Sequence, residues 1–170
     1  ERSGDGYLIY GQKHWTSMAQ RANKVLLLVR TTPREDVEKK TQGISLFYTD
    51  LNRDYVEIHE IAKMGRKAVD SNMLFIDDLF IPDGDLIGEE GRGFHYILHS
   101  MNPERIMVGA EGVGIGQDAL RRASGYAVER EVFGRPIGQN QGIQFPIAGA
   151  YIRLQGAIAV RDRAVSLAAC

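Results

Sequence analysis

Residues 126–148, YAVEREVFGRPIGQNQGIQFPIA, combine side chains that could bind an anionic ligand. This stretch contains two arginines, an aromatic residue between them and three consecutive amides, which are Arg130, Arg135, Phe133, Gln139, Asn140 and Gln141. A guanidinium is a planar fork that pairs with phosphate or carboxylate through two hydrogen bonds, which a lysine ammonium cannot do. Every basic residue of 91–170 other than histidine is an arginine. Two interpretations are open: an anion-binding loop, or an interhelical turn that Gly134 and Pro136 would also build.

Other common catalytic and metal-binding patterns are missing. Of the four histidines, only His95 and His99 have helical i,i+4 spacing, and no glutamate completes an H-E-x-x-H metal motif. The single cysteine, Cys170, excludes an internal disulfide or a cysteine-rich metal site. No G-x-S-x-G nucleophile elbow is present. The run VGAEGVGIGQ lacks the third glycine of a dinucleotide fingerprint, because Gln117 takes its place, and it has helical spacing throughout. We therefore predict no metal and no Rossmann fold.

The composition is that of a globular protein, with 44% hydrophobic and 25% charged residues. The formal net charge of −1 gives no reason to expect a nucleic-acid partner, because nucleic-acid binders usually carry a clear basic excess. No apolar run is long enough to cross a bilayer, and no basic-then-apolar leader opens the sequence. The sequence therefore predicts a soluble protein without a membrane span.

The first ninety residues have the pattern of β-strands. Runs rich in β-branched and aromatic residues are separated by turn residues, namely YLIYGQKHW, KVLLLVRTT, GISLFYTDL, YVEIHEIAKM and MLFIDDLFIP. No helix pattern lies between them, so the sheet must be mainly antiparallel, and five or six short strands favour a barrel or sandwich. The segment TTPREDVEKKTQG predicts a charged loop between two of the strands.

The period changes to that of helices after residue 90. Apolar residues recur at spacings of three, four or seven at Ile106, Ala110, Val113, Leu120 and Ala127. Gly109, Gly112 and Gly116 share another face, which predicts close approach by a neighbour, most simply a packed helix. A second helix is expected from Gln144. The fold class is therefore α+β, with a β domain at 1–90 and part of a helical domain at 91–170. The uncovered apolar surface of such a helical pair predicts a larger protein or an obligate oligomer.

Four motifs in the same order resemble the acyl-CoA dehydrogenase family over almost the whole chain. They are GQKHWTSMAQRANKVLLLVRT, KMGRKAVDSNMLFIDDLFIPDGDLIGEEGRGF, ERIMVGAEGVGIGQDAL and YAVEREVFGRPIGQNQGIQF. The resemblance implies the middle β domain and the first part of the C-terminal helical domain of a flavoenzyme. One departure is Lys67, at a position where the family usually has arginine, so a guanidinium contact there is not expected.

The resemblance implies a role for each candidate cofactor-binding residue. Trp15 matches the residue that packs against the flavin ring of FAD, and Ser17 matches the hydroxyl that hydrogen-bonds its reactive edge. Arg130, Phe133 and Gln141 match a loop that holds the adenine and diphosphate end of FAD in a neighbouring subunit. Without the resemblance, a strand tryptophan is usually a core residue, and the loop is an interhelical turn.

Two further residues are implied on the substrate side. In the sequence MNPERIMV, Glu104 has the arrangement of a family subset that places the α-proton base immediately before an arginine, and Arg105 matches that substrate-side arginine. Pro103 is expected to fix the turn that opens the helix. The alternatives are that Glu104 is an exposed partner of the helix dipole or that the base lies downstream of this chain, as in most of the family.

The resemblance therefore implies FAD-dependent α,β-dehydrogenation of an acyl-CoA thioester, with electrons passed to an electron-transfer flavoprotein. It also implies a homodimer or homotetramer, located in a bacterial cytoplasm or the mitochondrial matrix, and the chain by itself is expected to be inactive. Two alternatives remain: a flavin oxidase or monooxygenase on the same scaffold, and a non-catalytic relative used for acyl binding or assembly.

Overall fold

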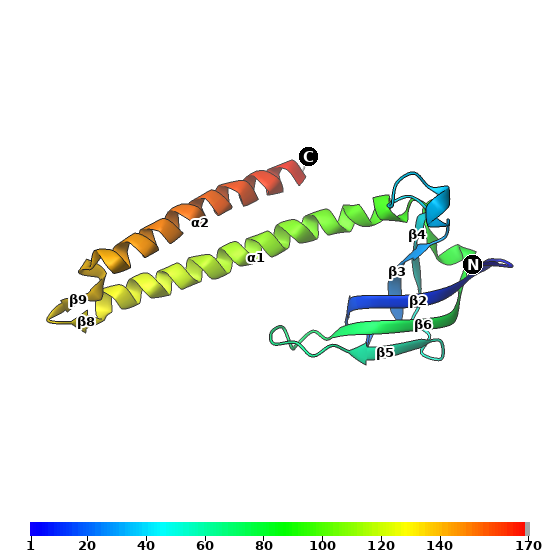
Figure 1. Cartoon of the computed structure of the whole chain (residues 1–170), viewed down its shortest axis with the longest axis horizontal. Coiled ribbons are helices and arrows are strands. Elements are labelled where there is room, and N and C mark those ends of the chain that lie inside the picture. Colours follow the sequence, from blue (N-terminus) through cyan, green and yellow to red (C-terminus); the bar gives the residue numbers. More distant parts are fainter. Residues whose placement is uncertain (169–170) are drawn as a thin grey trace. The chain divides into compact units, whose positions relative to one another are not determined.

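The structure of the chain is a computed structural model that describes residues 1–168, so Cys170 lies outside the described range. The chain divides into two compact units, Glu1–Leu98 and His99–Cys170, and the division falls inside a long helix. The first unit contains the strands β1 (Arg2–Ser3), β2 (Gly6–Ser17), β3 (Lys24–Arg30), β4 (Ile44–Asp50), β5 (Val56–Glu60), β6 (Ser71–Pro82) and β7 (Leu86–Ile87) (Figure 1). The later elements are α1 (Gly93–Glu129), β8 (Glu131–Val132), β9 (Arg135–Pro136) and α2 (Gln141–Ala168).

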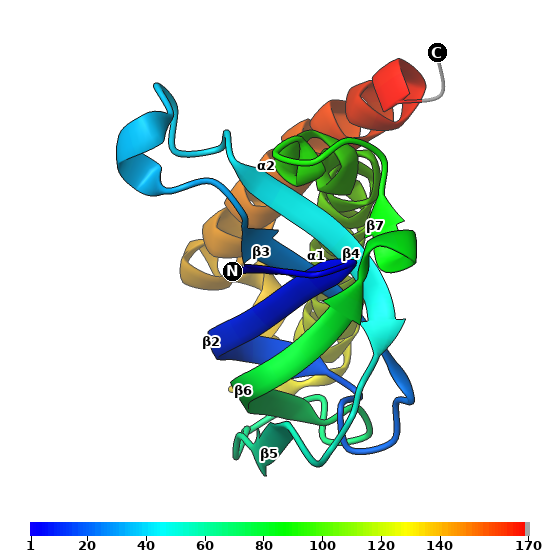
Figure 2. The same cartoon turned by 90° about the vertical axis from the view of Figure 1, so that its right-hand side faces the viewer.

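The strands of the first unit form two sheets. One sheet has the order β1-β2-β6-β5 and the other β3-β4-β7, and every strand pairing is antiparallel. In Figure 1 the strands β2, β6 and β5 run across the direction of β3 and β4, and Figure 2 shows the same two layers from the side. This arrangement confirms the predicted α+β class and the antiparallel β domain. The strands β1 and β7, each two residues long, were not predicted.

The core of the first unit lies between the two sheets. The pattern of β3 shows why: Val25 and Leu27 are buried, whereas Leu26 between them faces solvent with 47% exposure. Side chains from both sheets meet in the core, where the rings of Tyr7 on β2 and Phe47 on β4 pack edge to face at 5.1 Å. Both rings are almost fully buried. Burial of apolar side chains at about 1.5–3 kcal/mol each holds the two layers together.

The change to a helical period after residue 90 agrees with the start of α1 at Gly93, but the role predicted for Pro103 was wrong. Pro103 was expected to fix the opening turn of the helix, but it lies inside α1, which already begins at Gly93. A proline in a helix interior removes one backbone hydrogen bond, and tertiary contacts can outweigh that loss. Such contacts surround the first turn: a Cβ at Gly93 would collide with the backbone of Ser45 and Leu46, so the helix starts against β4. The second helix begins three residues earlier than predicted.

The link between α1 and α2 is also more regular than expected. The strands β8 and β9 form a two-residue hairpin, in which Val132 pairs with Arg135. Glu131 therefore belongs to a strand, although the sequence suggested helix up to that residue. The two helices approach each other at Gly116, where an added Cβ would lie 3.1 Å from Leu154 of α2. Gly109 and Gly112 have no neighbour within 4 Å in the described part of the chain, so the predicted close packing holds only for Gly116.

Candidate functional site

A bulge in β2 presents the predicted flavin-facing tryptophan. His14 and Trp15 lie opposite a single residue of β6, where the pairing register shifts. Trp15 has φ = 63°, an outlier for a bulky side chain. Its indole is 60% exposed, and the His14 ring packs edge to face against it at 5.0 Å. Bulges re-aim side chains next to binding sites, and this one turns the indole away from the core.

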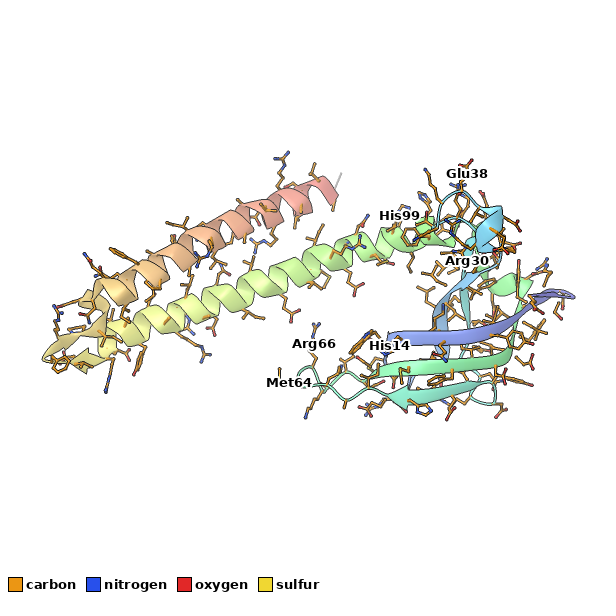
Figure 3. The ribbon with its side chains drawn as sticks, in the orientation of Figure 1. His14, Arg30, Glu38, Met64, Arg66 and His99 are labelled. Atoms are coloured by element: carbon orange, nitrogen blue, oxygen red, sulfur yellow. The ribbon has the colours of Figure 1, made fainter. Side chains whose placement is uncertain are left out.

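Ser17 is the last residue of β2 and lies at the same end of the sheet. It pairs with Ser71 of β6 and is exposed, and its hydroxyl makes no hydrogen bond within residues 1–168. Figure 3 shows His14 at this end, together with Met64 and Arg66 on the loop between β5 and β6. An exposed indole face and a free hydroxyl two residues apart can contact a flat ring that also carries hydrogen-bonding atoms.

The loop that carries the family departure has its own brace. The Lys63 ammonium donates to the backbone carbonyls of Arg66, at 3.3 Å, and of Val69. Arg66 itself has φ = 53°, so the backbone at this tip is in the left-handed region. Lys67 is exposed beside it. An ammonium at this position offers a point charge instead of a planar fork, so the bidentate contact that an arginine could make is not available.

The hairpin between the helices presents the second set of predicted residues. Phe133 and Gly134 form its two-residue turn with φ = 54° and φ = 74°, and positive φ at both positions is the requirement of a type I′ turn. The Phe133 ring is fully exposed at the tip. The Arg130 guanidinium is exposed just before the hairpin and makes no hydrogen bond or ion pair within the described residues. An unpaired arginine and a solvated aromatic ring at one tip are well suited to hold a ligand from outside this unit.

Of the three amides after the hairpin, one is hydrogen-bonded within its own loop and two are exposed to solvent. Asn140 accepts a hydrogen bond from the Arg135 guanidinium at 2.8 Å and donates to the Ile137 carbonyl at 3.1 Å. Arg135 and Asn140 therefore brace the loop, in place of the solvated or ligand-binding roles that the sequence left open for them. Gln141, the first residue of α2, is exposed, and so is Gln139. Gln141 thus remains available to a ligand.

Glu104 and Arg105 lie inside α1, both exposed. The Arg105 guanidinium donates to the Asn102 side chain at 3.2 Å and lines a hollow of about 470 Å³ between the two helices. Glu104 shares its helix face with Met107 and Val108, which are 71% and 56% exposed. Because α1 begins at Gly93, Glu104 lies well beyond the first turn in which the helix dipole acts, so its expected position at the helix N-terminus was wrong, whereas the exposure that this alternative also predicted is observed. The burial required of a base is not supplied by residues 1–168.

A half-buried lysine in β2 was not predicted from the sequence. The Lys13 ammonium donates to the backbone carbonyl of Leu28 on β3, and burial lowers the pKa of Lys13. Since β3 is the outer strand of its sheet, this contact satisfies a carbonyl at the seam between the two layers. Lys13 thereby anchors β2 two residues before Trp15. The motif K-x-W contains the signal, but the partner, fifteen residues away, is visible only in the fold.

The described residues contain neither a metal-binding cluster nor a helix that could span a membrane. No group of three or more histidine, cysteine or acidic side chains among residues 1–168 could hold a metal ion. Within the same range, neither of the two long helices is apolar enough to cross a membrane.

Comparison with known proteins matches both units to one family. The model for "Acyl-CoA dehydrogenase, middle domain" matches residues 1–79, and the model for "Acyl-CoA dehydrogenase, C-terminal domain" matches residues 91–169. Cyclohex-1-ene-1-carbonyl-CoA dehydrogenase of Syntrophus aciditrophicus is 33% identical over 167 residues, which are 98% of this chain and 39% of that protein.

The names of two further relatives mention an assembly or a bound ligand. The caffeyl-CoA reductase-Etf complex subunit CarC of Acetobacterium woodii is 32% identical over 165 residues, which are 96% of this chain and 42% of that protein. A solved structure of PigA with FAD and proline superposes with a TM-score of 0.85 at 26% identity, covering 95% of this chain and 42% of that one. The chain thus spans about two fifths of the length of these relatives.

Proposed function

The chain belongs to the acyl-CoA dehydrogenase family, since the family's middle and C-terminal domains match residues 1–79 and 91–169, and we propose that it is part of an FAD-dependent enzyme that introduces an α,β double bond into an acyl-CoA thioester. The observation that carries the proposal is the bulge of β2, which exposes the Trp15 indole beside the free Ser17 hydroxyl. The solved relative PigA contains FAD, which supports the same cofactor here.

The first unit has the chemistry to hold the flavin ring. The indole of Trp15 offers an aromatic face outside the core, and a flavin ring is a flat aromatic system that gains from such stacking. The Ser17 hydroxyl can donate to a ring nitrogen or accept from one. Within residues 1–168, neither side chain makes a hydrogen bond or ring contact apart from the edge contact of His14 with the indole. The donor set therefore fits the ring end of FAD.

The hairpin of the second unit fits the opposite end of a cofactor. The Arg130 guanidinium can pair with diphosphate oxygens through two hydrogen bonds, and the Phe133 ring can cover the adenine. Gln141 supplies an amide for the adenine or ribose. Because the hairpin tip is exposed and these groups have no hydrogen-bond partner among the described residues, we assign the tip to the FAD of a neighbouring subunit in a homodimer or homotetramer.

The chemistry of the proposed step divides between the chain and its cofactor. When bound, FAD supplies the acceptor for the hydride that leaves the β carbon of the acyl group. The Glu104 carboxylate takes the α proton, and the electrons of that C–H bond form the α,β double bond. Arg105, the next residue, is assigned to the substrate side, where its positive charge favours a thioester substrate that carries phosphates.

The electron acceptor that we propose is an electron-transfer flavoprotein. The relative CarC is named as a subunit of a complex with such a protein, which supports this partner. We place the enzyme in a bacterial cytoplasm or the mitochondrial matrix, where acyl-CoA substrates occur. The side chains that contact the acyl group determine which length and branching are accepted. We propose an acyl-CoA thioester as the substrate and assign no particular acyl group.

The test uses the complete protein that contains this chain. Its visible spectrum should show bound flavin, and anaerobic addition of acyl-CoA should bleach that absorption and yield the 2-enoyl-CoA. Reoxidation should be fast with electron-transfer flavoprotein and slow with oxygen. A protein purified without flavin, and unable to take up FAD, would contradict the proposal and support a non-catalytic relative. Rapid reoxidation by oxygen would identify a flavin oxidase or monooxygenase instead.

A further inference from the structure

The end of β2 and the turn that follows it are held on both sides of Ser17, by Asn72 of β6 and by Asp70 just before β6. The buried amide of Asn72 donates to the Thr16 carbonyl at 3.0 Å, so the peptide plane before Ser17 is held. The backbone N–H of Met18 donates to the Asp70 carbonyl at 3.2 Å, so the peptide plane after Ser17 is held as well. Fixing both planes fixes the backbone of Ser17 and therefore the direction of its Cα–Cβ bond.

The Asn72 side chain is fully buried and fully used. Besides the bond to Thr16, its Nδ2 donates to the Asp70 carboxylate, and its Oδ1 accepts from the Gln20 side chain at 2.9 Å. The Asp70 carboxylate also accepts from the Gln20 backbone N–H at 3.4 Å. These hydrogen bonds, that of Asn72 first, lower the pKa of Asp70. Asn72 is the buried member of this network, and its amide specifies one geometry because an unmet donor or acceptor there would be costly.

A second brace holds the same segment from its far end. The Arg53 guanidinium donates to three carbonyls of the turn, those of Ala19, Gln20 and Ala22, at 3.2, 3.2 and 3.1 Å. The Ala19 side chain is only 1% exposed and is part of the core. The turn is therefore a rigid part of the first unit, although it lies at the end of a strand.

The backbone around Ser17 shows why such bracing is needed. Trp15 has φ = 63° and Met18 has φ = 61°, both in the left-handed region that bulky side chains avoid. Conformations of this kind persist only where surrounding contacts over-determine them, and they concentrate at functional sites. Asn72 bonds to the backbone of Thr16, which lies between these two residues, and the Asp70 carbonyl bonds to the backbone of Met18 itself.

We propose that Asn72 is a positioning residue that, together with Asp70, directs the Ser17 hydroxyl toward the flavin. This inference rests on the flavin site proposed above. Asn72 does not touch the reacting atoms; it acts by holding the Thr16 carbonyl. Loss of its amide would free the peptide plane before Ser17, and the hydroxyl would lose its fixed direction while flavin remained bound through its other contacts.

The experiment measures flavin reduction by acyl-CoA in the complete protein, with four variants. Asn72→Leu removes all three side-chain hydrogen bonds at similar volume. Thr49→Val is the matched control, because Thr49 is equally buried on β4 and has no hydrogen bond to the turn. Ser17→Ala and the double variant Asn72→Leu/Ser17→Ala complete a double-mutant cycle, which separates a shared effect from independent ones.

If Asn72 acts through Ser17, Asn72→Leu should shift the flavin absorption and slow reduction by about 10- to 100-fold, since small misplacements have effects of that size. Thr49→Val should leave the spectrum and rate unchanged. In the Ser17→Ala background, Asn72→Leu should slow reduction by less than about threefold, because the hydroxyl that it positions is already gone.

Three results would overturn the inference. Asn72→Leu with wild-type spectrum and rate would show that Asn72 only stabilises the fold. Multiplicative slowing in the double variant would show that it acts independently of Ser17. A wild-type protein without flavin would remove the proposed function together with the inference. Should Asn72→Leu not fold, Gln20→Met removes one anchor from an exposed side chain, and the same double-mutant comparison decides.

Discussion

The backbone carbonyl of Arg130 accepts a hydrogen bond from the N–H of Ile137 at 2.8 Å, and this bond closes the hairpin between α1 and α2. Behind it, the chain packs closely, since a Cβ at Gly138 would lie 2.8 Å from the Ala127 carbonyl. The hairpin base is therefore fixed against the end of α1, and Phe133 stands at its fully exposed tip. A tip so firmly based can present an aromatic ring to another molecule without becoming disordered.

Replacing Phe133 should separate the stability of the hairpin from its function. Asn is the preferred first residue of a type I′ turn, whereas a bulky residue at positive φ costs roughly 1–2 kcal/mol. Phe133→Asn should therefore slow amide hydrogen exchange of the Ile137 N–H by about fivefold or more, while FAD dissociates faster because its aromatic contact is lost. Phe133→Tyr keeps the ring and serves as the control. Slower exchange with unchanged FAD retention would remove Phe133 from the cofactor site.

Arg130 should be sensitive to the shape of its cation as well as to its charge. Arg130→Lys keeps the positive charge but loses the planar fork that diphosphate favours. We expect lower FAD content after dialysis and a weaker oligomer, measured by absorbance and by sedimentation. Arg135→Lys is the comparison, because Arg135 is engaged with Asn140 inside its own loop. Full flavin content and an intact oligomer in Arg130→Lys would exclude the proposed contact.

Much of the fold followed from local pattern in the sequence. The strands β2 to β6 were predicted because β-branched and aromatic runs between turn residues determine strands locally. The contacts that hold the start of α1 were not predicted: the Tyr96 hydroxyl accepts from the Glu89 N–H at 3.1 Å, and the Ser45 hydroxyl accepts from the Gly91 N–H at 2.8 Å. No helical period or cap could reveal contacts of this kind.

The candidate site shows the same division. Trp15, Ser17 and the hairpin residues were identified because short motifs carry them. Asn72, in contrast, contacts residues 52 and 56 positions away, and Arg53 reaches a turn more than 30 positions away. An asparagine within a strand pattern suggests only a weak strand residue. Its role became visible when the pairing of β2 with β6 placed it under the turn.

Acid should weaken the second unit through Asp118. Its carboxylate accepts from the guanidinium groups of Arg121 at 2.7 Å and Arg122 at 2.6 Å, and these bonds, Arg121 first, lower the pKa of Asp118. A carboxyl whose pKa is lowered by folding stabilises the fold above its ordinary pKa, and that contribution is lost as the pH falls through the lowered value.

Thermal unfolding of Asp118→Asn checks this sign. The melting temperature of the variant should lie below wild type at pH 7, and the difference should shrink as the pH falls below about 4. Because all three side chains are exposed, the difference should be small and should decrease in 1 M salt. Asp54→Asn, at a carboxylate without an ion pair in the described part of the chain, should show no such trend. A difference that grew in acid would contradict the assignment.

Removal of the Ser17 hydroxyl tests the flavin edge directly. Ser17→Ala should keep bound flavin but shift its absorption and slow reduction by roughly 10- to 1000-fold, the range for loss of one hydrogen bond at a reacting centre. Ser17→Thr keeps the hydroxyl and should retain most of the rate. Ser71, opposite Ser17 on β6, provides a control position. A normal rate of flavin reduction in Ser17→Ala would show that Ser17 is a surface residue of the first unit without a role at the flavin.

Glu104 decides whether this chain contains the base. Its helix face continues into Met107 and Val108, which are exposed here and would gain from cover by an acyl chain. Such cover would place the carboxylate against the acyl group from which it is proposed to take the proton. Glu104→Gln preserves size and should slow reduction by about 10²- to 10⁴-fold without loss of flavin. Glu111→Gln, two turns later on the same face, is the matched control. Flavin reduction at the wild-type rate in Glu104→Gln would show that the base lies outside this chain.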